Sequence, residues 1–161
     1  VAIHNLFFTD DVLEDFDTNY KVQPPLRSQE HVDALIAGVK DGTIDMVTSD
    51  HNPLDIERKH LEFDHADFGA IAQEATFGAL STIVSTKKAI QLLTAGMQLF
   101  GESPPIITTE EKVDLTLFSP KGSYTFEKEH ILSKSKNAIF LGSKLKGKVY
   151  GILANGKKVL N

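Results

Sequence analysis

The sequence has no cysteine, which excludes disulfide bonds and metal sites built from thiolates. It also has no apolar run close to the roughly 18 residues that a membrane-spanning helix requires. The first residues do not form a basic segment followed by an apolar one, so no secretory leader is expected. These absences predict a cytoplasmic protein that does not enter a membrane.

Histidine occurs six times, but the spacings typical of metal ligands are missing. The chain has no His-x-His and no His-x-x-x-His pair. His60 and His65 lie in a polar stretch, where solvated histidines are commoner than ligands. Spacing alone therefore predicts no metal site.

What the chain does have is the composition of a folded protein. Its 161 residues are 41% hydrophobic and 24% charged, enough for one domain with a core or for parts of two. The charge is uneven, because residues 1–111 hold 7 basic and 19 acidic side chains, and residues 112–161 hold 10 and 3. This asymmetry predicts two regions of different character. The basic region lacks a nucleic-acid motif, so no nucleic-acid partner is expected.

The first region reads as alternating helix and strand. Ser28 precedes a helix with apolar residues at Val32, Leu35, Ile36 and Val39, and Gly42 ends it. The run "TIDMVTS" (43–49) predicts a buried strand that ends at Asp50. A helix followed by a strand is typical of a parallel α/β layout. A short helix is expected after Thr9.

Downstream of Asp50 we expect a long polar loop over 51–69, with one helical turn near "DIERKH" (55–60). A buried small-residue helix over 70–84 and a helix capped by Thr86 and closed by Gly101 should follow. On that second helix, Ile90, Leu93, Met97 and Phe100 should face the core.

The second region begins after "ESPP" (102–105) and reads as β structure. "VDLTLF" (113–118) alternates with period two, and "SYTF" (123–126) is a second candidate strand. Asn155-Gly156 lies between two alternating runs, which predicts a hairpin with a type I′ turn.

Asp50 is the strongest candidate for chemistry, because reacting groups of parallel α/β proteins lie at the carboxyl ends of strands. A carboxylate there can bind a metal or accept a proton from bound water. It can equally cap its own loop by accepting hydrogen bonds from nearby backbone amides. His51 is more typical of a group that orients other groups than of a ligand.

Several segments together resemble the dihydroorotases and related cyclic amidohydrolases. "VTSDHNP" resembles the family's "TDHAPH" signature, and "KVQPPLR…DGTID" resembles "KVNPPLR…DGTID". "IHNLFFTDD" resembles "PHHLLLTDE", "FGAIAQEATFGAL" resembles "FGIIGLETAL", and the segment from "KEHILSKSKN" to "LANGK" resembles the family's closing stretch. The order and the gaps stay in register over essentially the whole chain.

The resemblance implies the C-terminal part of a metal-dependent (β/α)8 barrel over residues 1–105, and a β-rich segment of a small sandwich domain over 106–161. It implies reversible hydrolysis of the ring amide of dihydroorotate to N-carbamoyl-aspartate, a step of pyrimidine synthesis, with a divalent metal that is usually zinc. Asp50 would bind the metal and move the proton of the attacking water. Gln23, Leu54, Phe68 and Gly69 occupy the family's substrate-binding positions.

The chain also departs from the family pattern. Leu54 stands where the family has a histidine, Gln23 where it has an asparagine, and Asn5 where "PHH" has its second histidine. The remaining metal ligands do not map onto residues 1–161, and one carboxylate cannot hold a catalytic zinc ion alone.

Two interpretations follow. The chain, which begins with Val1, is either a fragment of an enzyme or a non-catalytic relative with a structural or partner-binding role. The fragment should be inactive alone and should complement the N-terminal part of the barrel, or form a homo-oligomer. Its ligand would be a small cyclic amide.

Overall fold

The computed structural model describes residues 1–102, 107–108 and 114–160. Five α-helices occur in this part of the chain, together with three short 3-10 helices and one antiparallel sheet. The helices are α1 (His4–Phe7), α2 (Gln29–Asp41), α3 (Ile56–Lys59), α4 (Gln73–Ile83) and α5 (Thr86–Leu99); the 3-10 helices are η1 (Asp10–Leu13), η2 (Thr18–Tyr20) and η3 (Lys128–His130); the strands are β1 (Leu115–Thr125), β2 (Lys144–Ala154) and β3 (Lys157–Leu160).

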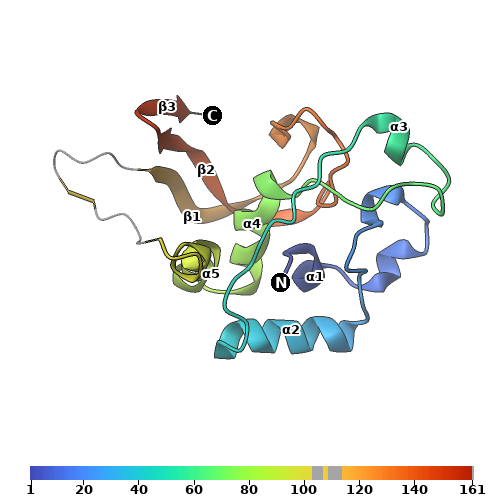
Figure 1. The fold of residues 1–161 in the computed structure, drawn as a ribbon, viewed down its shortest axis with the longest axis horizontal. Helices are drawn as coiled ribbons and strands as arrows, with labels where there is room; N and C mark the ends of the chain where they lie inside the picture. Colours follow the sequence, from blue (N-terminus) through green and yellow to red (C-terminus); the bar gives the residue numbers. More distant parts are fainter. Residues whose placement is uncertain (103–106, 109–113, 161) are drawn as a thin grey trace.

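Figure 1 shows α4 in the middle of the fold, with the sheet on one side and α1 on the other. Gly78 of α4 explains how β2 comes close, because a Cβ added there would lie 3.0 Å from the Cβ of Leu145. The buried core includes residues from both of the regions that the sequence distinguishes. Phe140, for example, contacts Phe7 and Phe8, with ring centroids 5.1 Å apart in each pair.

The α2 prediction is confirmed. The helix follows Ser28 and ends at Gly42, whose φ of +94° is in the left-handed region that glycine favours. Val32 and Val39 are buried on its inner face. The turn at α3 is also present, and Thr9 precedes a helical segment, although η1 is a single 3-10 turn.

The strand predicted over 43–49 is reduced to a short parallel pairing. The N–H of Ile3 donates to the carbonyl of Thr48 (2.9 Å), and the N–H of Thr48 donates to the carbonyl of Val1 (2.9 Å). A parallel strand needs neighbours along its length to form a ladder. The described residues supply a neighbour only to this end of the predicted strand.

Two predictions about α5 are wrong. Its N-cap is Ser85, whose Oγ accepts from the N–H of Lys88 (3.3 Å). Ile90 and Phe100 are 41% and 81% exposed, whereas Ala89 and Leu92 are buried. Leu93 packs against the core and Met97 is half-buried, so this part of the predicted face is confirmed. Ala89 and Leu92 are also covered, because α4 and the segment at Val47 lie against that side.

The β predictions are largely confirmed. The two candidate strands in 113–126 are one strand, β1, which pairs with β2 on both sides of an irregularity between Ser119 and Ser123. Asn155 and Gly156 have φ of +52° and +71°, as a type I′ turn between β2 and β3 requires. The boundary predicted after "ESPP" lies outside the described residues.

Candidate functional site

Asp50 lies directly after the parallel pairing at Thr48 and has a φ of +47°. Such a conformation is uncommon for a residue with a side chain, although aspartate tolerates it better than most. The side chain of Asn52 donates to both the carbonyl and Oδ1 of Asp50, at 3.1 Å each. The carboxylate is one-third exposed, so it is held in place while remaining accessible to a ligand.

The other oxygen of this carboxylate faces His4. Nε2 of His4 lies 3.9 Å from Oδ2 of Asp50. The His4 ring is 1% exposed, and neither of its nitrogens has a hydrogen-bond partner among the described residues. Burial lowers the pKa of His4 below its usual 6.5, although the Asp50 charge opposes the shift. His4 is therefore a neutral imidazole at pH 7.

His51 stabilises the start of α4. Its Nδ1 accepts from the N–H groups of Ala72 (3.3 Å) and Gln73 (3.2 Å), so the ring proton is on Nε2. Nε2 then donates to Oγ of Ser133 (3.3 Å), which donates to Oε1 of Glu74 (2.5 Å). This arrangement gives His51 an orienting role and leaves it no free nitrogen for a metal.

Glu74 completes this chain of hydrogen bonds. Burial raises the pKa of Glu74, but the hydroxyl and N–H of Ser133 donate to its carboxylate and help to bring the pKa below the usual value. The carboxylate is thus charged at pH 7 and accepts from Ser133.

Gly69 lies against the loop that follows Asp50. Its φ is +130°, and a Cβ added to it would lie 2.8 Å from the Cβ of Asn52. Its N–H donates to the carbonyl of Lys21 (2.9 Å). Its carbonyl accepts from Nζ of Lys59 (3.0 Å) and from Nδ2 of Asn137 (3.2 Å). The backbone groups of Gly69 are thus used within the protein.

The other predicted substrate-binding residues lie around Gly69. Leu54 is half-buried, and its Cδ1 would be 3.5 Å from a Cβ at Gly69. Phe68 is 54% exposed, with the Lys21 ammonium 4.8 Å from its ring centroid. Gln23 is exposed and lies two residues after Lys21, whose carbonyl binds Gly69. The structure therefore brings together the segments that the sequence nominated.

Two buried lysines fasten the loop that carries Phe68. Nζ of Lys21 donates to the carbonyls of Phe63 (2.6 Å) and Asp64 (2.9 Å). Nζ of Lys59 donates to the carbonyl of Asp67 (2.9 Å) as well as to that of Gly69. Burial lowers the pKa of Lys59 to about 8, and the nearby Lys21 charge acts in the same direction.

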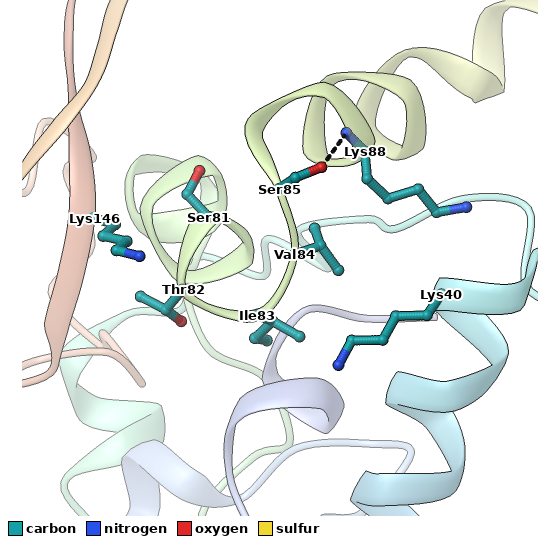
Figure 2. A pocket seen from close by; sticks show the side chains of 8 residues that line it. All are labelled: Lys40, Ser81, Thr82, Ile83, Val84, Ser85, Lys88 and Lys146. Atoms are coloured by element: carbon teal, nitrogen blue, oxygen red, sulfur yellow. Dashed lines mark hydrogen bonds between the residues drawn. The ribbon is translucent and has the colours of Figure 1, made fainter.

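A surface cavity of about 590 Å³ lies away from Asp50. Figure 2 shows its lining, with Ser81 and Thr82 at the C-terminal end of α4, Lys88 on α5, Lys40 on α2 and Lys146 on β2. It contains none of the predicted site residues. His51 binds the opposite end of α4, about 15 Å away along the helix.

Asp50 has few potential metal ligands around it in the described part of the chain. The group of acidic and histidine side chains there whose ligand atoms come together is Glu62, Asp64 and His65, all exposed. Asp50 is not in that group. A metal bound by Asp50 would need further ligands from outside the described residues, as the sequence predicts.

Sequence reasoning missed four residues at this site: His4, Asn52, Lys59 and Asn137. His4, Asn52 and Asn137 lie inside the segments that carry the family resemblance, but contacts between distant segments, such as His4 with Asp50 and Asn52 with Asn137, give them their roles. The burial of polar side chains here arises from the fold, and the polar segments around Lys59 and Asn137 give no sign of it in the sequence. His4, Lys59 and Asn137 are 1%, 3% and 6% exposed.

Comparisons with known proteins confirm the resemblance. The chain is 38% identical to a dihydroorotase of Caldicellulosiruptor saccharolyticus over 161 residues, covering 96% of this chain and 37% of that protein. It is 38% identical to a dihydroorotase of Endomicrobium trichonymphae, covering 97% of this chain and 39% of that protein. The chain thus spans about two-fifths of the length of these curated relatives. No family model matches the chain.

Solved structures agree in fold. A D-hydantoinase matches with a TM-score of 0.83 at 22% identity, covering 100% of this chain and 38% of that one. A dihydropyrimidinase from Brevibacillus agri matches with a TM-score of 0.83 at 24% identity and the same coverage. A Saccharomyces cerevisiae dihydroorotase in complex with 5-fluoroorotic acid matches with a TM-score of 0.69 at 16% identity, covering 92% of this chain and 42% of that one. The described fold is therefore that of one portion of these larger proteins. None of the helices in the described part of the chain combines the length and apolar character that a bilayer crossing requires.

Proposed function

We propose that the chain is the C-terminal part of a dihydroorotase-like enzyme that reversibly hydrolyses the ring amide of dihydroorotate to N-carbamoyl-aspartate. The observation that carries the proposal is the position of Asp50. Its carboxylate is accessible, follows a parallel pairing, and is bound by Asn52, which lies against the Gly69 segment that also contacts Leu54 and Lys21. Sequence similarity over nearly the whole chain supports it.

In this proposal residues 1–105 supply the last strands and helices of a (β/α)8 barrel. The parallel pairing of Val1–Ile3 with Thr48 supports this assignment, because neighbouring strands of such a barrel are parallel. Residues 106–161 supply strands of a small sandwich domain. The missing strands and any N-terminal ligands come from the rest of the protein or from a complementing chain. A cytoplasmic location and a homo-oligomeric assembly are further parts of the proposal.

Asp50 would bind a divalent metal, most simply zinc, through a carboxylate oxygen. A bound metal of this kind lowers the pKa of a water molecule and so supplies a nucleophile at neutral pH. The fit is partial, because the described residues offer Asp50 and an unpartnered, buried His4 but no full ligand set. Asp50 itself would accept the proton of the attacking water, since Oδ1 is fixed by Asn52 and Oδ2 faces His4.

Leu54, Gln23 and Phe68 would contact the substrate. Leu54 contributes an apolar surface where the related enzymes carry a histidine, so binding of the dihydroorotate carboxylate should be weaker. This departure favours the second candidate, a non-catalytic relative that binds a partner. In that case Asp50 would serve as a loop cap, consistent with its hydrogen bonds to Asn52.

The test is Asp50→Asn in the whole protein that contains this chain. Asparagine keeps the shape and tolerates the positive φ of residue 50, but its amide cannot accept the proton. Turnover of dihydroorotate should fall by about 10²–10⁴-fold or more, with unchanged thermal stability. Unchanged turnover would return Asp50 to the role of a loop cap. A wild-type protein that hydrolyses no cyclic amide when loaded with zinc would favour the non-catalytic candidate.

A further inference from the structure

Asn137 belongs to neither of the segments that carry Asp50 and Phe68, yet it binds both. It lies at the end of a segment, residues 133–137, that we call the closing segment. The segment is held at both ends by the core, because Ile131 before it and Ala138 after it are buried. The N–H of Ile71 also donates to the carbonyl of Asn137 (2.9 Å). The closing segment is therefore a fixed reference for the loops that it contacts.

The Asn137 side chain uses its full hydrogen-bonding capacity. Nδ2 donates to the carbonyls of Asn52 (3.0 Å) and Gly69 (3.2 Å). Oδ1 lies within hydrogen-bonding distance of the hydroxyl of Ser135 (2.5 Å), whose single proton also faces the carbonyl of Leu54, and of the N–H of Leu54 (3.4 Å), which also donates to Oγ of Ser135 (3.0 Å). Two donors face two carbonyls and the oxygen faces two donors, so the orientation of the amide is unambiguous. The side chain is 6% exposed, where such bonds are strong and costly to lose.

These bonds connect to Asp50 through one intermediate residue. Asn52 is bound to Asn137 through its carbonyl and to Oδ1 of Asp50 through its side chain. Leu54 is bound to Asn137 through its N–H. A shift of Asn137 would therefore move the proton-accepting carboxylate and the substrate-facing loop relative to each other.

We propose that Asn137 is a positioning residue for the reaction, and that it sets the placement of Asp50 relative to Leu54 and Phe68. This inference rests on the proposed function. The physical reason is that misplacing reacting groups by about 1 Å can cost about 10²-fold in rate. Ser135 supports Asn137, because its hydroxyl lies between Oδ1 of Asn137 and the backbone of Leu54.

The test uses the whole zinc-loaded protein with Asn137→Leu, Asn137→Ser and Lys134→Ala. Leucine has the same branching of side-chain heavy atoms as asparagine, with a larger volume, and removes all four hydrogen bonds, whereas serine is smaller and keeps one hydroxyl donor. Lys134 is the matched control, since it is exposed on the same segment. We expect kcat to fall about 10- to 100-fold for Asn137→Leu and less for Asn137→Ser, with wild-type zinc content. Lys134→Ala should retain wild-type kcat.

A second measurement is independent of turnover. Amide hydrogen exchange over residues 52–69 should be faster in both Asn137 variants than in the wild type, and unchanged in Lys134→Ala.

A double variant tests whether Asn137 and Asn52 act on Asp50 along one path. The fall in log kcat for the double variant of Asn137 with Asn52→Ala should be smaller than the sum of the falls for the two single variants.

The outcomes separate the two proposals. An active wild type whose Asn137 variants keep full kcat overturns the positioning role and leaves the proposed function standing. A kcat loss that matches a loss of folded protein or of zinc also overturns it, because that result indicates a structural role only. An inactive wild type overturns the proposed function, and the positioning role with it, whatever the exchange rates show.

Discussion

The imidazole of His4 lies 3.9 Å from the carboxylate of Asp50, measured from Nε2 to Oδ2, with no hydrogen-bond partner on either ring nitrogen in the described part of the chain. The distance is too long for a hydrogen bond. A buried polar group without a partner costs about 1–3 kcal/mol. Such a cost concentrated beside a candidate catalytic carboxylate is typical of a site in which stability and function compete.

His4→Leu should therefore separate stability from activity. Leucine has a similar volume and no polar atoms, so we expect the free energy of unfolding of the whole protein to rise by about 1–2 kcal/mol. Turnover of dihydroorotate should fall, because the imidazole that lies 3.9 Å from Oδ2 of Asp50 is removed. Denaturant titration and steady-state kinetics measure the two effects. A variant that is less stable than wild type would show that His4 has a partner outside this chain.

Gly69→Ala should be strongly destabilising for a steric reason. The added Cβ would approach the Cβ of Asn52 to 2.8 Å, and the φ of +130° is unfavourable for alanine. We expect a loss of about 2–4 kcal/mol in the free energy of unfolding, together with reduced turnover. Gly142→Ala is the matched control, since its φ is +82° but no atom lies within 4 Å of the added Cβ. Equal thermal shifts for the two variants would contradict the steric explanation.

The lowered pKa of Lys59 predicts that the free energy of unfolding depends on pH. Its pKa is about 8 in the folded chain and 10.5 as the reference for an unfolded one. Between these values the unfolded chain binds more protons, so the free energy of unfolding rises with pH. Relative to Lys59→Met, the wild type should gain roughly 3 kcal/mol between pH 7.5 and 10.5. A neutral amine still has N–H groups for the carbonyls of Asp67 and Gly69. Parallel unfolding experiments across this range check the sign, and a constant difference between the two proteins would refute it.

Leu54→His tests what the chain binds. If the whole protein acts on dihydroorotate, a histidine beside Gly69 should donate a hydrogen bond to the substrate carboxylate. Such a bond contributes roughly 1.5–3 kcal/mol, so KM should fall by about one to two decades. If the wild type is already efficient and Leu54→His leaves KM unchanged, another side chain, such as His60, makes the hydrogen bond to the substrate carboxylate. Absence of turnover in both forms would support the partner-binding candidate.

The parts of the fold that the sequence predicts well depend on local contacts. The helix Gln29–Asp41 and the turn at Asn155-Gly156 follow from apolar spacing and from positions that require a positive φ. The inner face of α5 does not follow, because Ala89 and Leu92 are buried by segments distant in sequence while Phe100 remains exposed. The strand that leads to Asp50 is also short, since its remaining neighbours are not among the described residues.

The candidate site shows the same division. Asp50 follows from its place after a predicted strand, and Leu54 and Gly69 follow from the resemblance between segments. The structure places their segments together. Asn137 and His4 were not nominated. Asn137 binds a residue 85 positions away along the chain, and His4 faces one that is 46 positions away. A single sequence contains no signal for pairs at such separations.

The two lysine contacts of the loop have a consequence for how its binding specificity can change. Lys21 and Lys59 bind the carbonyls of Phe63, Asp64, Asp67 and Gly69, and every amino acid has such a carbonyl. Substitutions in the loop therefore leave the acceptors in place. Phe68 lies between these bound carbonyls and its side chain is exposed. A substitution of Phe68 therefore leaves the hydrogen bonds from Lys21 and Lys59 to the loop backbone in place. A point mutation at Phe68 thus changes an exposed side chain while the backbone of the loop stays anchored.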